Sequence, residues 1–423
     1  MTLLVAVFIA VLAMLCWFHS RSLLFPPVVF CSVWAVVLIA LALSGDAFYA
    51  LSDLTLFLCT LSCLAFSAGG IGFSCLQREG KLRQIGFKSA QKGVWTLRTV
   101  DALFIVFAVL YPFYWTRLAA IGQGSVGLYL LQAVRTEMVQ GDTGSSAGLG
   151  IFSYVLFTSI LITLIVTTET CRLHLPKGRL FLWIALTMAY NIPTGARLGS
   201  LEVMFGVFAI FAFVKGRFPF VAALSIGTCV LFIFTVASVV LGKGGSLENS
   251  PLENVDGVTK SLQVYALGGI VACDQLLQHS PVRTDKAPSL HFFFEVGSAL
   301  GLNSQAPPLR RREVSTPWTT NVYSIYYDYL QDFGWVGTSI IFFSLGAAMA
   351  SLHWLAATGR PEAITLLGLG CSYLVLTCAG DPFIVGLSAC IQSVVFVLLI
   401  YNLVPLLRWC TLLRSPSPNA CAS

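Results

Sequence analysis

Charged side chains are scarce in this sequence. Asp, Glu, Lys and Arg make up 10% of its 423 residues, whereas soluble globular domains carry about a quarter. Apolar residues make up 57% of the chain, and the mean hydropathy is +0.83. Apolar runs long enough for a helix to cross a bilayer recur along it, and short alternating segments of a transmembrane barrel do not dominate. The composition excludes an ordinary soluble protein and predicts an all-α polytopic membrane protein, with residues 1–423 forming one transmembrane domain.

Several motifs are also missing. There is no Walker pattern, no Rossmann-type glycine fingerprint, no HExxH motif and no CxxC pair. Most of the 13 cysteines fall inside apolar runs, where a thiol behaves as a small apolar side chain. We therefore expect no cofactor, no metal site, no disulfide framework and no nucleic-acid partner. The first apolar run lacks a basic start and a small-residue cleavage site, which predicts a retained helix.

The hydropathy pattern predicts about 11 transmembrane helices. Most of the 25 lysines and arginines then fall on one side of the membrane, and the positive-inside rule makes that side cytoplasmic. The N-terminus is predicted to lie outside and the C-terminus inside. The expected spans are about 2–18, 25–44, 54–75, 102–116, 150–168, 180–191, 199–214, 219–241, 334–352, 363–379 and 384–405.

Two large extracytoplasmic loops are expected, at about 117–149 and 242–333. The longer loop contains two stretches with helical spacing of apolar residues, 258–279 and 289–302, which we expect to lie against the bilayer surface. The sixth span is short and ends in Asn191-Ile192-Pro193-Thr194-Gly195-Ala196-Arg197. Its proline and glycine predict an irregular break that faces protein or water.

The positive-inside rule disfavours arginines on the outer side, and we single out five of those that stand there: Arg135, Arg197, Arg310, Arg311 and Arg312. A guanidinium group matches phosphate oxygens in pairs, so these residues are candidates for binding a substrate pyrophosphate. The alternative is that they pair with outer acids or with lipid head groups.

Four carboxylates are candidates for a catalytic role, in which one accepts a proton from an attacking sugar hydroxyl: Asp328, Asp332, Glu313 and Glu137. Asp328 and Asp332 share a face if the segment is helical. Asp332 also precedes a predicted span, so it is equally a candidate helix cap. Glu202 lies inside a span and could hold Arg197 in place. Asp381, before a proline, fits a turn without further function.

Aromatic residues crowd the end of the long loop. Tyr323, Tyr326, Tyr327 and Tyr329 fit an interfacial tyrosine belt. The alternative is that some of them, with Trp318, line a groove for sugars, because an aromatic face packs on the apolar side of a sugar ring.

Three stretches give the chain a resemblance to the Wzy-type O-antigen (oligosaccharide repeat-unit) polymerases of bacterial inner membranes. They are 191–198, the run Tyr265-Ala266-Leu267-Gly268-Gly269-Ile270-Val271-Ala272-Cys273-Asp274, and Thr320-Asn321 followed by Asp332-Phe333-Gly334 and Gly337. The layout of about a dozen spans with two sizeable outer loops is similar too. Asn321 joins the predicted sugar-binding set on this basis.

The resemblance implies a glycosyltransferase of the inner membrane, with its active site facing the periplasm. Such enzymes move a growing glycan from undecaprenyl pyrophosphate onto the non-reducing end of a new lipid-linked repeat unit, without a metal. Arginines would neutralise the leaving pyrophosphate. The implied partners are the undecaprenyl-pyrophosphate-linked oligosaccharide and membrane lipid, and the resemblance allows a chain-length regulator as well.

Two alternatives to the polymerase stay open. The related O-antigen ligases carry a His-Asn type signature, but here Thr320 precedes Asn321, which favours a polymerase. A lipid-linked oligosaccharide transporter or flippase should carry charged residues along several spans. Here most of them cluster at the outer ends and in outer loops.

Overall fold

The computed structural model describes residues 1–78, 90–123, 125, 127–140, 149–194, 197–216, 227–228, 235, 250–279, 288–302, 314–320 and 322–414. For some of these, Arg135 and Arg197 among them, it describes the backbone alone. The described chain is almost entirely helical. Its main helices are α1 (Thr2–Ser20), α2 (Pro26–Leu43), α3 (Asp53–Arg78), α4 (Ala90–Ile121), α5 (Leu128–Gln140), α6 (Phe152–Arg172), α7 (Gly178–Asn191), α8 (Arg197–Lys215), α10 (Pro251–Gln263), α11 (Gly269–His279), α12 (His291–Ala299), α13 (Tyr326–Ala357), α14 (Pro361–Leu376) and α15 (Leu387–Arg414).

Seven of the described helices are long and apolar enough to cross a membrane: α1, α2, α3, α4, α6, α8 and α13. Two shorter apolar helices, Pro361–Leu376 and Leu387–Asn402, coincide with the last two predicted spans. The predicted span 180–191 corresponds to α7, which has 14 residues. The predicted span 219–241 lies outside the described residues except at isolated positions. The prediction of an all-α, multi-pass membrane protein is thus confirmed.

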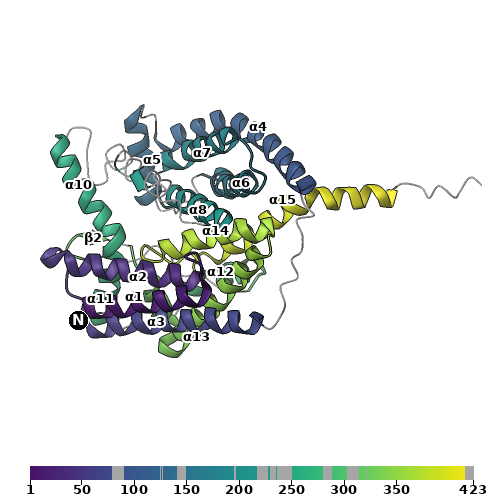
Figure 1. Ribbon diagram of the computed structural model, residues 1–423. Helices are drawn as coiled ribbons and strands as arrows, with labels where there is room; N and C mark the ends of the chain where they lie inside the picture. The colour runs from purple at the N-terminus through teal and green to yellow at the C-terminus, as the bar shows by residue number, and fades with distance from the viewer. Residues whose placement is uncertain are drawn as a thin grey trace, which may run out of the picture.

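The helices pack in two groups that meet along α14 (Figure 1). Helices α1, α2, α3 and α13 form one group, and α4, α6 and α7 lie on the other side, while α14 contacts both α13 and α8. Backbone touches backbone between α3 and α13. A methyl group added at Gly346 would lie 2.0 Å from the carbonyl oxygen of Phe66, and one added at Gly69 would lie 2.0 Å from that of Phe343. Such close approach through small residues is typical of helix packing in membranes.

Tyrosine hydroxyls fasten α4 to α7 in the second group. The Tyr114 hydroxyl donates to the backbone oxygen of Tyr190 at 2.6 Å. The Tyr190 hydroxyl donates to the backbone oxygen of Phe107, also at 2.6 Å. Both tyrosines are fully buried. These bonds hold the end of α7 in place just before the predicted interruption of helical structure at 191–197.

One end of the helix bundle gathers basic residues. The end of α1 meets α13 through Ser22 and His353, and the start of α7 meets α4 through a two-pronged ion pair between Arg179 and Asp101, at 2.7 and 2.9 Å. We call this the basic end. The basic residues on it whose side chains are described are Arg21, Arg98, Arg172, Lys177, Arg179, Lys215 and Arg360.

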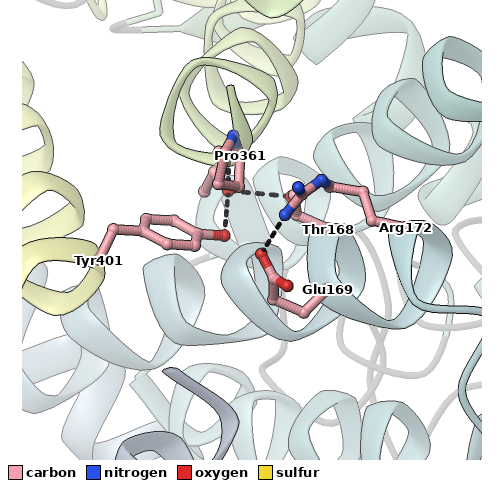
Figure 2. Close-up of polar contacts among 6 residues, drawn as sticks. Thr168, Glu169, Arg172, Pro361 and Tyr401 are labelled. Carbon is pink, nitrogen blue, oxygen red and sulfur yellow. Dashed lines mark hydrogen bonds and ion pairs between the residues drawn. The ribbon is translucent and has the colours of Figure 1, made fainter. Parts of the chain in front are cut away.

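A buried polar cluster joins three helices at the basic end (Figure 2). Glu169 and Arg172 form an ion pair of 2.9 Å on α6 with side chains 0% and 4% exposed. The Thr365 hydroxyl of α14 lies 2.9 Å from the Thr168 hydroxyl and 3.2 Å from the Tyr401 hydroxyl of α15. The predicted fifth span ended at 168, one turn too early, because α6 carries this ion pair inside the bundle instead of in a loop.

The predicted outer loop 242–333 contains the two expected helical stretches. The predicted stretch 258–279 is divided by a π-helical turn at Val264–Gly268, which separates α10 from α11. Helix α10 begins at a capping box, in which Ser250 and Glu253 exchange hydrogen bonds. The bond that the backbone N–H of Ser250 donates to the Glu253 carboxylate holds the pKa of Glu253 below its usual value. A 3-10 turn, η4 (Pro288–Leu290), leads into α12, and a two-stranded hairpin pairs β1 (Val314–Ser315) with β2 (Thr319–Thr320).

Candidate functional site

The start of α13 lies at the opposite end of the bundle from the basic end. There the backbone N–H of Ser324 donates to the carbonyl oxygen of Gly269 on α11 at 3.1 Å. The next N–H, of Ile325, donates to the carbonyl oxygen of Thr377 after α14 at 3.0 Å. We call this meeting of α11, α13 and the 377–386 segment the junction. It brings together residues more than 100 positions apart in the chain.

Gly269 makes the junction possible. A methyl group on its α-carbon would lie 2.3 Å from the carbonyl oxygen of Cys378 and 3.2 Å from the nitrogen of Ser324. Because a contact of 2.3 Å to backbone cannot be relieved by rotating a side chain, this position requires glycine. Close packing therefore explains why the second glycine of the Gly268-Gly269 pair is a glycine.

The Asp332-Phe333-Gly334 tripeptide also has a structural basis. Gly334 interrupts α13 with φ 64° and ψ −171°, a backbone conformation essentially restricted to glycine. Just before it, one carboxylate oxygen of Asp332 accepts a 2.8 Å hydrogen bond from the backbone N–H of Ser289 in η4. Asp332 therefore caps the turn that leads into α12, whereas the sequence suggested a cap on its own helix.

Two further buried carboxylates hold the junction together. Asp274 of α11 accepts from the backbone N–H and the hydroxyl of Ser52, at the start of α3, and from the Gln278 side chain at 2.7 Å. Asp381 accepts the Tyr329 hydroxyl at 2.8 Å and the N–H groups of the three residues 383–385 at 2.9 to 3.2 Å. Burial raises the pKa of Asp381, and these hydrogen bonds oppose that shift. The bonds to 383–385 match the expected turn.

The predicted catalytic acids occupy different surroundings. Asp328 is buried, at 1% exposure, and Asp332 is half-buried. Glu137 lies exposed on α5. Glu313 lies outside the described residues, as do Arg310, Arg311, Arg312 and Asn321.

The aromatic residues of this segment are mostly packed inside the protein. Tyr323, Tyr326 and Tyr329 are buried, and Tyr326 lies against Trp34 with ring centroids 4.4 Å apart. Tyr327 stacks on Tyr323 at 5.3 Å and stays half-buried. Trp318, half-buried, meets Phe48 edge to face at 5.3 Å. Tyr327 and Trp318 are therefore the members of the predicted sugar-binding set that keep exposed surface among the described residues.

The two remaining predicted arginines belong to neighbouring elements. Arg197 is the first residue of α8, directly after the predicted break, which contains the 3-10 turn η2 (Ile192–Thr194). Helix α5, which carries Arg135, packs against η2. Asn191 links the two sides of the break. Its side-chain N–H donates to the backbone oxygen of Thr187 at 2.9 Å, and its side-chain oxygen lies against Gly199 of α8. The structure thus places the backbones of both arginines around one feature at the junction end.

Helix α14 connects this break to the junction. It packs along α8, which carries Glu202 in its second turn, and along α13. Because α14 packs on both α8 and α13, the helix that begins at Arg197 and the helix that carries Asp328 and Asp332 start at the same end of the bundle.

Sequence reasoning singled out the glycine-rich stretch and Asp274 but assigned the aspartate no partner. Ser52 lies 222 positions away, so no local pattern pointed to it. The Tyr329–Asp381 bond was also missed, although an aspartate in a turn between two spans offered a signal for it. No protein-family model, curated protein or solved structure matches the chain.

Proposed function

We propose that the protein is an integral-membrane glycosyltransferase that polymerises undecaprenyl-pyrophosphate-linked oligosaccharide repeat units, an O-antigen polymerase of the Wzy type. The observation that carries the proposal is the grouping of predicted phosphate-binding and acidic elements at one end of the helix bundle. Helices α5 and α8, which carry Arg135 and Arg197, meet at the break. The start of α13, with Asp328 and Asp332, lies at the same end beyond α14.

In this proposal, Arg135 and Arg197 grip the pyrophosphate of the donor at the break, with Arg310, Arg311 and Arg312 as further candidates. When the glycosidic bond to the pyrophosphate breaks, negative charge grows on the leaving phosphate oxygen. Guanidinium groups placed beforehand stabilise that charge without reorganising. A helix N-terminus adds to this effect, because its free N–H groups and dipole favour an anion, and Arg197 is the first residue of α8.

A carboxylate then accepts the proton of the attacking sugar hydroxyl. The hydrogen bonds of two acids support a positioning role for them. Asp274 and Asp381 each accept hydrogen bonds on both oxygens from protein donors, which suits positioning of α11 and of the 381–385 turn. Glu137 is exposed on the helix that contacts the break, and Asp328 and Asp332 lie on α13. We propose the base among these three and Glu313.

Replacing Arg197 with alanine tests the proposal. In a strain that depends on this gene, Arg197→Ala should abolish long glycan chains and leave lipid capped with a single unit, because the donor pyrophosphate loses its partner. The readout is a gel of surface polysaccharide. Arg117→Ala is the matched control: Arg117 is exposed near the end of α4 at the same end of the bundle, and its loss should preserve the ladder.

Deletion of the gene separates the polymerase from its closest alternative. Loss of the long chains alone supports polymerisation, whereas loss of all attached glycan identifies a ligase. A normal ladder from Arg197→Ala would remove that residue from the site.

A further inference from the structure

A cavity of about 320 Å³ opens at the basic end, far from the junction. Its walls come from the end of α1, the turn into α2, the last residues of α8, and α13, and include Trp17, Arg21, Ser22, Leu24, Phe213 and His353. This volume falls at the lower limit of small-molecule sites, which span about 300–1,000 Å³. The proposed glycosyltransferase reaction makes no use of it.

Arg21 occupies an unusual backbone position at this cavity. It caps the end of α1 with φ 56° and ψ 21°, and its N–H donates to the carbonyl oxygen of Trp17 at 2.7 Å. Glycine is the residue usually found in this left-handed conformation at a helix end, since a side chain there carries a conformational cost. The chain nevertheless places a long cationic side chain at the cavity.

The Arg21 guanidinium has an aromatic partner in place of an acid. Its central carbon lies 5.5 Å from the centroid of the Phe18 ring. Ion pairs between described residues include those of Arg172, Arg179, Lys260 and His291, and none of these includes Arg21. The charge is therefore not neutralised by any described carboxylate, and an anion can approach it.

The rest of the cavity lining has a polar part, formed by Ser22 and His353, and an apolar part. The Ser22 hydroxyl lies 3.3 Å from a ring nitrogen of His353. The His353 ring contacts Phe25 and Phe213 edge to face, with centroids 5.6 and 5.5 Å apart. Trp17 and Leu24 complete an apolar wall. A ligand that fits has an anionic polar group for Arg21 and Ser22 and a hydrocarbon part for the remaining surface.

We propose that this cavity is a binding site for an anionic phospholipid, with its phosphate against Arg21 and its glycerol and upper acyl chains along Trp17, Leu24 and Phe213. It lies where the membrane-spanning helix α1 ends, which is the level of lipid head groups. The cations of the basic end raise the local concentration of anions, and basic pockets between transmembrane helices are suited to acidic head groups. The proposal is independent of the glycosyltransferase reaction.

The test measures lipid retained by the purified full-length protein. The protein is equilibrated in nanodiscs of equal phosphatidylglycerol and phosphatidylcholine, released into mild detergent and examined by native mass spectrometry. We expect the wild type to retain phosphatidylglycerol selectively and Arg21→Gln to retain about tenfold less, since a hydrogen bond to a charged group is lost. Arg360→Gln removes the same charge at the same end outside the cavity and should retain lipid like the wild type.

A second variant and a competition experiment complete the test. Arg21→Gly relieves the left-handed conformation, so it should melt no lower than the wild type while losing the lipid; this separates binding from folding. Equal retention by the wild type and both Arg21 variants overturns the proposal. So does displacement of the lipid by millimolar glycerol 3-phosphate or inorganic phosphate, because the cavity would then bind a free anion and not a phospholipid.

Discussion

At the scale of single residues, three carboxylates at the junction end act as anchors. Asp274 and Asp381 engage both of their oxygens with protein donors, and Asp332 accepts the N–H of Ser289. Each of these acids joins elements that are distant in the chain or closes a turn. An oxygen that already accepts strong hydrogen bonds in a fixed geometry is less available to a substrate proton. Position in the sequence alone cannot separate such an anchor from a general base.

The buried Glu169–Arg172 pair gives a prediction at this scale. Glu169→Gln removes the carboxylate charge opposite Arg172 inside the bundle, so we expect it to destabilise the protein by about 3–5 kcal/mol. Asp101→Asn breaks the exposed Arg179 pair, whose side chains are 37% and 45% exposed, and should cost about 1 kcal/mol or less. Unfolding of the detergent-solubilised protein in SDS measures both. Equal losses would mean that the burial of Glu169 does not matter energetically.

At the scale of elements, the junction depends on how closely three backbones approach. Helix α11 reaches the start of α13 and the 377–386 segment through Gly269, directly after a π-helical turn. Such π-turns are rare and occur frequently at functional sites. The wider helical turn ends at Gly268, and the close contact is made by the next residue, Gly269.

Neighbouring glycines provide a matched pair of variants for this contact. Gly269→Ala puts a methyl group 2.3 Å from the Cys378 oxygen, whereas at Gly268 the nearest atom is a side-chain carbon of Val264 at 3.3 Å. We expect Gly269→Ala to cost about 1–3 kcal/mol through overpacking, and Gly268→Ala clearly less. Melting in detergent measures this difference, and the polysaccharide ladder reports whether the junction still functions. If Gly268→Ala were the worse variant, the Cys378 contact would not govern the junction.

The elements themselves follow largely from the sequence, and their partners do not. Apolar runs located the spans because helix formation in lipid is forced by backbone hydrogen bonding. Pro193 and Gly195 located the break, because proline and glycine locally disfavour a continuous helix. The Ser52–Asp274 bond and the Cys378–Gly269 approach depend instead on packing between distant segments. The burial of Tyr326 against Trp34 was likewise invisible, because a tyrosine at a membrane boundary fits a belt, a groove or a core equally well.

At the scale of the whole molecule, charge separates the two ends of the bundle. The described basic side chains lie at the basic end except Arg117 and Lys260. Asp274, Asp328, Asp332 and Asp381 lie at the other end. The positive-inside rule predicts that the basic end faces the cytoplasm. In that orientation the junction faces the periplasm, as the proposed reaction requires.

Reporter fusions test this orientation. Alkaline phosphatase is active only after export, so a fusion at about residue 286, in the predicted outer loop 242–333, should be active. A fusion at about residue 88, between α3 and α4, should be inactive. A cytoplasm-active reporter such as green fluorescent protein should give the opposite pattern at the two positions. Reversal of both patterns would turn the junction toward the cytoplasm, where a flipped lipid-linked donor is not accessible.

The break at Gly334 has a consequence for how the protein sits in membranes of different thickness. The segment after it, 335–357, is about 34 Å long at 1.5 Å per residue, slightly more than a typical hydrocarbon core of about 30 Å. Helices adapt to such a mismatch by tilting. The helix is interrupted at Gly334, so a tilt of the long segment need not tilt the segment before it, which carries Asp328 and Asp332. That earlier segment is hydrogen-bonded to α11, to η4 and to Thr377. We therefore expect the positions of these carboxylates to depend little on lipid composition.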